Sequence, residues 1–292
     1  MQKNVLNDIV YAPVSSWEKH TLDLYYPSTH KTAPTSRPII VFVHGGAWRT
    51  GDKSGFVDLA SNLAESTGNV VAVINYTLSI AITKDGPTSV PSKAQHPKHV
   101  QDIASALGYL YTHSQEHGGY NPDRFYLVGH SAGGQITGLL ALRPDLYLMP
   151  VEIELGLTIG TLHKAIHGVI GVEGIYNVHR LLRVWPSYSD FVIQGFGHDP
   201  NALIHGSPDG QWVPSLDFTL PHYAIIQSNQ DELVDPAQAK DYFKYLQSVS
   251  SDSSRNRVVI EFGDWGSHDA MLQTPQFIKT ITKYIHEWES QQ

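Results

Sequence analysis

The chain of 292 residues contains no cysteine, which excludes disulfide bonds, thiolate nucleophiles and cysteine zinc sites. Charged residues make up only 16% of it, the net charge is −8, and no basic run is present that would neutralise phosphates. We therefore expect no nucleic-acid partner. Apolar runs of the ~20 residues that span a membrane are also lacking, and residues 1–8 have no apolar core of signal-peptide length. These absences favour a cytoplasmic protein with no membrane partner.

Short apolar segments alternate along the chain with segments of helical character. Strands are predicted at 38–43, 69–74, 125–128, within 167–176, at 222–228 and at 258–262. Helices are predicted at 55–67, 96–117, 135–142, 177–184, 237–249 and 275–288. This alternation predicts a single α/β domain over residues 1–292, with a mostly parallel central sheet and helices on both faces.

The remaining segments are predicted to lie at the periphery of that sheet. Residues 10–27 read as a strand or hairpin at the sheet edge, 80–95 as a loop bordering the binding site, and 144–155 as irregular. Residues 185–220 are rich in aromatic side chains and broken by proline and glycine, which favours a lid or cap-like insertion. The alternative is an aromatic subdomain that only packs against the core.

The most informative run is 124–134, where an apolar strand leads into Gly129-His130-Ser131-Ala132-Gly133 and then into a helix-like stretch. G-x-S-x-G at a strand-to-helix turn is the nucleophile-elbow pattern, in which a tight turn raises the serine hydroxyl above the sheet. The amide of Ala132 would then face an oxyanion. The pattern alone is weak, because glycine and serine are common.

A second motif, His44-Gly45-Gly46-Ala47-Trp48, directly follows the predicted strand at 38–43. Two glycines leave the backbone amides of Gly45 and Gly46 uncovered, and in hydrolases of this architecture such a loop supplies an oxyanion-hole amide. The alternative is a plain turn between strand and helix. A dinucleotide site is not favoured, because the G-x-G-x-x-G fingerprint is missing.

Two later loops supply an acid and a base. Asp231 follows the strand at 222–228, and His268 follows the strand at 258–262. Ser131, Asp231 and His268 then occur in the Ser…Asp…His order of the α/β-hydrolase fold, in which the histidine takes the serine proton while the acid orients its ring. Asp235 is the competing acid, but it precedes Pro236 and looks like a helix N-cap; Glu232 is a third choice.

Most of the sixteen histidines are expected to be structural or exposed. His44 is expected to brace the oxyanion loop, and His96 and His99 to be solvated residues of a helical first turn. The run 113–117 matches the zinc pattern H-x-x-E-H, but it precedes Gly118-Gly119, where histidines suit a helix end. No metal is therefore expected.

With both motifs in view, the chain resembles the kynurenine formamidase (arylformamidase) family of α/β-hydrolases, whose oxyanion motif is H-G-G-x-W. Trp48 is the discriminating residue, because related esterases usually carry H-G-G-G. The segments 173–177, 181–182 and 185–188 look like the G-I-Y…L-L…P-x-Y segment of fungal formamidases. The likeness extends from about Asp23 to the last helix.

This resemblance implies hydrolysis of N-formyl-L-kynurenine to L-kynurenine and formate in the cytosol, a step of tryptophan degradation, without metal or cofactor. It assigns Ser131, Asp231 and His268 to the catalytic triad and the amides of Gly45, Gly46 and Ala132 to the oxyanion hole. As a hypothesis, Trp48, Tyr76, Tyr176 and Trp185 form aromatic walls for the substrate ring, and Glu173 meets its α-ammonium group. The expected partner is a small-molecule substrate, and a homodimer is left open.

Two alternatives follow from the same residues. A carboxylesterase acting on a small or secondary-metabolite ester would share the triad and most of these motifs. A hydrolase-fold receptor or scaffold without catalysis usually lacks a triad member, and none is missing in this chain.

Overall fold

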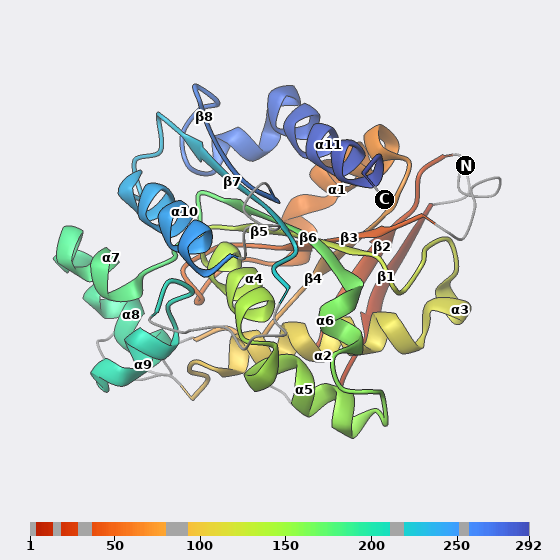
Figure 1. The fold of residues 1–292 in the computed structure, drawn as a ribbon, viewed down its shortest axis with the longest axis horizontal. Helices are drawn as coiled ribbons and strands as arrows, with labels where there is room; N and C mark the ends of the chain where they lie inside the picture. The colour runs from red at the N-terminus through yellow and green to blue at the C-terminus, as the bar shows by residue number, and fades with distance from the viewer. Residues whose placement is uncertain are drawn as a thin grey trace.

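The computed structural model describes residues 4–13, 19–28, 37–79, 93–210, 219–250 and 257–291 (Figure 1). Most of the loop predicted at 80–95, and Trp212 within the predicted lid, lie outside these residues. None of the described helices is long and apolar enough to cross a lipid bilayer.

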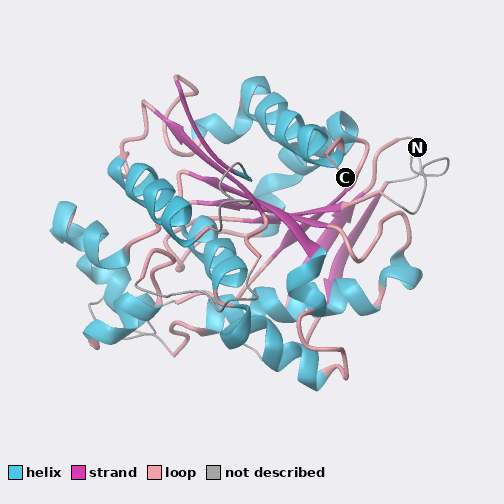
Figure 2. Ribbon diagram, viewed as in Figure 1, coloured by secondary structure: helices cyan, strands magenta, loops and turns pink. Residues whose placement is uncertain are grey.

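The described strands form one eight-stranded sheet in the order β1-β2-β4-β3-β5-β6-β7-β8, surrounded by helices (Figure 2). All neighbouring pairs from β4 to β8 are parallel, whereas β1 pairs with β2 and β2 pairs with β4 in antiparallel fashion. The strands are β1 (Val5–Val10), β2 (Thr21–Tyr25), β3 (Ile39–Val43), β4 (Val70–Ile74), β5 (Phe125–His130), β6 (Ile166–Val172), β7 (His222–Ser228) and β8 (Val258–Gly263). Residues 10–27, predicted as a strand or hairpin at the sheet edge, contain β2, whose antiparallel partner β1 lies before this range except for Val10.

Strand β3 shows why helices cover both faces of the sheet. All five of its residues are buried, because successive side chains point to opposite faces and both faces are packed. Ile39, Val41 and Val43 join the core layer that includes residues of α2 (Lys98–Thr112) and α4 (Ala132–Leu142). Ile40 and Phe42 join the layer beneath α1 (Val57–Thr67) and α11 (Pro275–Glu289), which lie together on the other face in Figure 1.

The helices follow the predicted order. They are α1 (Val57–Thr67), α2 (Lys98–Thr112), α3 (Ser114–His117), α4 (Ala132–Leu142), α5 (Pro144–Glu154), α6 (Thr161–Ala165), α7 (Val178–Val184), α8 (Ser189–Phe196), α9 (Pro200–His205), α10 (Ala237–Val249) and α11 (Pro275–Glu289). Short 3-10 helices occupy Lys53–Phe56, Pro186–Tyr188 and Ala270–Gln273. The prediction of a mostly parallel α/β sheet with helices on both faces is therefore confirmed.

The prediction that 144–155 is irregular was wrong, because α5 fills this segment. Pro144 stands at the first helical position, where its missing N–H costs nothing. Pro150 lies inside the helix and removes one backbone hydrogen bond, yet the helix continues. Tyr147 and Leu148 are buried, and α5 packs on α2 and α4, so tertiary packing outweighs the proline signal.

The segment predicted as a lid contains a short 3-10 helix followed by α8 and α9. It is joined to β6 through α7, which is capped by the Asn177 side chain accepting the Arg180 backbone N–H at 2.6 Å. Figure 1 shows α7, α8 and α9 grouped beside α10 at one end of the molecule. The function of the segment 185–220 as a lid stays a prediction.

Candidate active site

Ser131 occupies the turn between β5 and α4 in a conformation that L-residues seldom adopt, with φ 54° and ψ −118°. Its backbone N–H donates to the carbonyl of Val172 at 2.9 Å, which ties the turn to β6. The turn is tight enough that a Cβ on Gly133 would lie 2.1 Å from the Val43 carbonyl oxygen. The glycine of the motif is therefore required for close approach to β3.

His268 and Asp231 meet at the same edge of the sheet although 37 positions separate them. His268 Nδ1 lies 3.0 Å from Asp231 Oδ1, and both side chains are almost completely buried. The carboxyl ends of parallel β7 and β8 place the two loops side by side. Because the carboxylate accepts at Nδ1, the ring's Nε2 is left unprotonated when the histidine is neutral, as a general base requires.

Asp231 is held in its ionised form by donors around both oxygens. Oδ1 also accepts the backbone N–H groups of Leu233 at 2.8 Å and Val234 at 3.0 Å, and Oδ2 accepts from Gln227 Nε2 at 2.8 Å. Burial by itself would raise the pKa of Asp231, but the hydrogen bonds from His268 and these amides outweigh it and lower that pKa. The carboxylate thus stays charged beside the ring.

Asp235, the competing acid, has different partners. Its carboxylate accepts from Arg180 Nη2 at 2.9 Å and from the Ala237 backbone N–H at 2.9 Å. This is the helix-end position that Pro236 indicated, and the structure brings Asp231, not Asp235, to the His268 ring.

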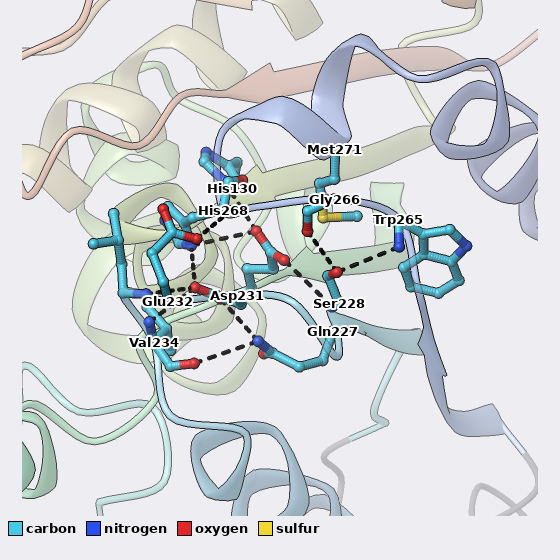
Figure 3. A network of polar contacts seen from close by, with 12 residues as sticks. His130, Gln227, Ser228, Asp231, Glu232, Val234, Trp265, Gly266, His268 and Met271 are labelled. Atoms are coloured by element: carbon cyan, nitrogen blue, oxygen red, sulfur yellow. Dashed lines mark hydrogen bonds and ion pairs between the residues drawn. The ribbon is translucent and has the colours of Figure 1, made fainter.

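The loop that carries His268 is fixed by polar contacts drawn in Figure 3. His130 Nε2–H donates to the His268 carbonyl at 3.1 Å, and the His268 backbone N–H donates to Glu232 Oε2 at 3.1 Å. The Ser228 hydroxyl donates to the Gly266 carbonyl at 2.6 Å. These contacts hold the histidine loop against β5 and β7, so the ring position is set by the backbone on both sides.

Ser131 and His268 line one cavity of about 330 Å³. Its walls are formed by Gly46, Ala47, Arg49, Thr50, Ile175, Leu181, Tyr188, Phe191, Leu233, Val234 and Asp269. Among the described residues, the Ser131 hydroxyl forms no hydrogen bond to the His268 ring. Such contacts often tighten only when substrate binds.

The glycine loop after β3 borders the same cavity. A Cβ on Gly45 would lie 2.7 Å from Ser131 Cβ, so only glycine allows the loop to approach the serine. Gly46, Ala47 and Trp48 all have positive φ values, of 98°, 50° and 60°. The backbone N–H groups of Gly46, Ala47 and Ala132 donate to no other described residue, and such uncommitted amides beside a nucleophile suit an oxyanion.

His44 and Tyr76 support this loop from behind. The Tyr76 hydroxyl donates to the carbonyls of His44 at 3.1 Å and Gly45 at 3.2 Å, and the two rings stack with centroids 4.6 Å apart. Burial lowers the pKa of His44 to about 4, so its ring is neutral. The expectation that His44 braces the loop agrees with this packing.

The structure corrects the expectation that Trp48, Tyr76 and Tyr176 form the cavity wall, because all three are fully buried. The Trp48 indole N–H donates to Gln135 Oε1 at 3.0 Å, which ties the glycine loop to α4. Tyr176 stacks on Tyr242 with ring centroids 4.0 Å apart. Aromatic rings suit a ligand ring, but the hydrogen bonds and packing of these three side chains place them in the core.

Trp185 and Glu173 are also placed differently from the expectation. Trp185 is 36% exposed and stacks on Tyr188 without lining the cavity. Glu173 is fully buried, with Oε2 3.3 Å from His268 Nδ1 and Oε1 accepting the Ser228 backbone N–H at 3.3 Å. A group without solvent access, directed at the histidine, does not meet a substrate ammonium group.

The expectation that His96 and His99 are solvated was wrong. His99 is 1% exposed and contacts the Ser79 hydroxyl at 2.7 Å. Burial lowers the pKa of His96 to about 3 and that of His99 to about 4. The H-x-x-E-H run consists of His113 and the four residues of α3, and its two histidines, His113 and His117, both contact Tyr109. Those contacts account for the two histidines without zinc.

Three ligand-type side chains, from His130, Glu173 and His268, bring one ligand atom each within 4.8 Å of one another. Two of these atoms are already used as donors. His130 Nε2 carries a hydrogen toward the His268 carbonyl, and His268 Nδ1 carries one toward Asp231. A nitrogen that bears hydrogen has no lone pair for a metal, so this donor set does not fit a cation.

Comparison with known proteins supplies the family. A family model described as BD-FAE matches residues 22–246, more than half of the chain. The chain therefore belongs to the BD-FAE family. Kynurenine formamidase from Meyerozyma guilliermondii is 29% identical to this chain, and the alignment covers 84% of this chain and 83% of that relative. Probable carboxylic ester hydrolase LipM from Mycobacterium tuberculosis is 27% identical over 80% of this chain and 48% of its own.

A solved structure supports the fold assignment. The crystal structure of esterase B from Lactobacillus Rhamnosis is similar with a TM-score of 0.75 and 19% identity, covering 99% of this chain and 86% of that one. The predicted α/β-hydrolase fold and the resemblance to kynurenine formamidases are thus confirmed. This chain is a hydrolase of the α/β-hydrolase fold.

Several residues that shape the site were not predicted from the sequence. Arg49, Tyr188 and Phe191 line the cavity, and His130 fixes the histidine loop. Arg49 directly follows Trp48 in the sequence, and this position next to the glycine motif could have indicated that it lies at the site. The two aromatic residues lay within the predicted lid. The hydrogen bond from His130 to the His268 carbonyl could not be predicted from the sequence, because it depends on the distance between β5 and the loop after β8.

Proposed function

We propose that this chain hydrolyses N-formyl-L-kynurenine to L-kynurenine and formate. The observation that carries the proposal is a serine and a histidine that line one cavity, whose walls include Tyr188 and Phe191, with a carboxylate 3.0 Å from the histidine Nδ1. The similarity to a relative named kynurenine formamidase supports this substrate. In this proposal the reaction is a cytosolic step of tryptophan degradation through kynurenine.

In the first half of the reaction, the Ser131 oxygen attacks the formyl carbon and its proton passes to His268 Nε2. Asp231 orients the ring and stabilises the imidazolium, since its hydrogen bond to Nδ1 is charge-assisted. The tetrahedral intermediate then expels the arylamine, which takes the proton from His268. A formyl ester of Ser131 is left behind.

In the second half, water replaces the arylamine. His268 takes a proton from the water as it attacks the formyl ester, and returns that proton to the Ser131 oxygen as the C–O bond breaks. Formate leaves and the serine is restored. No step needs a metal or an oxidant.

Negative charge on the carbonyl oxygen in both halves is stabilised by backbone amides. Gly46 and Ala47 line the cavity, Ala132 begins α4 beside Ser131, and the N–H groups of all three are uncommitted among the described residues. Loss of one such donor typically costs ~3 to 4 kcal/mol of transition-state stabilisation. We assign the oxyanion hole to these amides; Gly45, which was also expected to supply a donor, is not among the residues that line the cavity, and it provides the close approach of the loop to Ser131.

For the amino-acid part of the substrate, we propose recognition by Arg49. Arg49 Nη1 pairs with Asp190 at 2.8 Å and its guanidinium lies 5.1 Å from the Phe191 ring centroid. Arg49 lines the cavity, and the Arg49 and Asp190 side chains are 31% and 35% exposed. An α-carboxylate suits the guanidinium and an α-ammonium suits Asp190, because a zwitterion offers the complementary pair of charges.

The experiment that tests the function compares N-formylkynurenine with p-nitrophenyl acetate at equal enzyme concentration. We expect the larger kcat/KM for N-formylkynurenine. A large preference for the acetate would contradict the formamidase and favour the second candidate, a carboxylesterase, which the similarity to a probable carboxylic ester hydrolase supports.

A variant series sharpens this test. Arg49→Ala should raise KM about 10-fold for N-formylkynurenine, equivalent to ~1.4 kcal/mol, and leave KM for p-nitrophenyl acetate within threefold. Arg143→Ala is the matched control, since Arg143 pairs with Asp145 at 3.1 Å outside the cavity. Equal KM changes in Arg49→Ala for both substrates would refute the assignment.

A further inference from the structure

Glu173 is a buried carboxyl group for which the reaction above has no use. It is fully buried, and its Oε2 forms no hydrogen bond among the described residues. Yet Oε2 lies 3.3 Å from His268 Nδ1, only slightly farther than the 3.0 Å between that nitrogen and Asp231 Oδ1. Two carboxyl groups therefore face the same ring nitrogen.

The sheet order explains this arrangement. Ser131 follows β5, Glu173 follows β6 and Asp231 lies beyond β7, and these three strands are consecutive neighbours. The carboxyl end of β6 therefore opens between the nucleophile and the acid. A carboxylate there is as well placed to reach His268 as one after β7.

The backbone at Glu173 supports a specific role. Its φ is 48°, in the left-handed region that is unusual for a residue with a Cβ. Its N–H donates to the Ile226 carbonyl at 2.8 Å, which holds the strained residue against β7. Glycine would adopt this conformation at lower cost, but glycine stands at position 174 and not at position 173. The side chain of Glu173 is therefore the feature that justifies the strain.

We propose that Glu173 is a second positioning acid for His268, which stays in reserve while Asp231 is ionised and orients the ring when that charge is removed. The inference rests on the catalytic roles proposed above for Ser131, Asp231 and His268. It does not depend on the identity of the substrate.

The charge state of Glu173 supports this division of roles. Burial and, next, the negative charge of Asp231 raise the pKa of Glu173 to about 9, so it is protonated at neutral pH. A neutral carboxyl cannot compete with Asp231 for the ring N–H. When the Asp231 charge is absent, one of these causes disappears and Glu173 ionises at lower pH.

Other groups around Glu173 must be considered in any pH measurement. The titratable side chains close to it come from the end of β5, the segment after β6, the loop after β7 and the loop after β8; they are His130, Tyr176, Asp231, Glu232, His268 and Asp269. The backbone N–H of Ser228 also points at Oε1. Glu232 is the useful comparison, because it accepts the His268 backbone N–H and not the ring.

The test is a double-mutant cycle on the full chain with p-nitrophenyl acetate as substrate. Loss of a triad acid usually lowers the rate ~10⁴-fold. We expect Asp231→Asn to lower kcat/KM only about 100-fold, Glu173→Gln to lower it about threefold, and the double variant to reach the full ~10⁴-fold loss. Glu173→Gln would therefore cost far more when Asp231 is absent.

Two further readouts separate this role from a structural one. In Asp231→Asn, the pH profile of the remaining activity should include a rise that reports the ionisation of Glu173, and the double variant should lack this component. Glu232→Gln, the matched control, should cost the same factor with and without Asp231→Asn. If Asp231→Asn does not fold, judged by circular dichroism, Asp231→Ser takes its place in the cycle.

The outcomes are distinguishable from those for the proposed function. If Glu173→Gln costs the same factor in both backgrounds, the inference about Glu173 is refuted whatever the natural substrate is. If wild type hydrolyses the acetate but not N-formylkynurenine, the proposed substrate fails and the cycle still decides the role of Glu173. If a fluorophosphonate does not label Ser131, the roles on which both proposals rest are wrong.

Discussion

Replacing Ser131 by glycine should make the folded protein more stable than replacing it by alanine, although both variants lose activity. At φ 54° and ψ −118° the Cβ of residue 131 clashes with its own backbone, whereas glycine adopts this conformation freely. Alanine retains the Cβ and therefore retains the strain. Because both changes remove the hydroxyl, the comparison isolates the backbone conformation.

The magnitude follows from two opposing terms. Strain of this kind costs ~1 to 3 kcal/mol. Glycine gives back ~0.4 to 1 kcal/mol through its extra freedom in the unfolded chain. The net advantage of Ser131→Gly over Ser131→Ala is then about 0.5 to 2 kcal/mol. For a chain of 292 residues this corresponds to a Tm difference of ~1 to 3 °C.

Thermal and urea unfolding of the two variants measure this difference, with p-nitrophenyl acetate hydrolysis as the activity control. If Ser131→Gly unfolds at the same temperature as Ser131→Ala or below it, the turn is not strained and the reasoning is refuted. Substantial hydrolysis by either variant would contradict the role of Ser131 as nucleophile.

Three further predictions follow from the surroundings of the site. Gly45→Ala should lower kcat at least 100-fold with little change in folding, because its Cβ would lie 2.7 Å from Ser131 Cβ; unchanged kcat would show that the loop moves freely. Trp48→Phe should lower the free energy of unfolding by ~1 to 3 kcal/mol in urea titrations, since Gln135 Oε1 loses its donor; no loss would mean that water or another donor replaces the indole. Burial lowers the pKa of His44 to about 4 and that of His130 to about 3, from 6.5, so the unfolded chain binds more protons and stability falls as pH drops below 6.5. Each of the two rings should lower the free energy of unfolding by ~3 kcal/mol between pH 6.5 and pH 4. A free energy of unfolding that does not change over this pH range would contradict the prediction.

The local elements of the site could be predicted because their causes are local. Continuous β-branched runs such as 39–43 require burial on both faces, and Gly129-x-Ser131-x-Gly133 requires a tight turn between a strand and a helix. Distance from a strand end and the position of Pro236 favour Asp231 over Asp235 as the acid. Both are properties of neighbouring residues.

The substrate contacts could not be predicted in the same way. The aromatic rings of Trp48, Tyr76 and Tyr176 suit an aromatic ligand, but the same rings suit a core. Whether a ring lies in a cavity or in the core depends on which helices cover it. Arg49 and Phe191 lie on segments about 140 positions apart, and only packing brings them together at one cavity.

The sequence by itself determined the strands, the two glycine turns and the order of nucleophile, acid and base, since periodicity, turn chemistry and chain order are written in adjacent residues. Only the tertiary structure decided that Glu173 faces His268. That contact is set by the side-by-side position of β6 and β7 and by burial, both of which depend on the whole sheet.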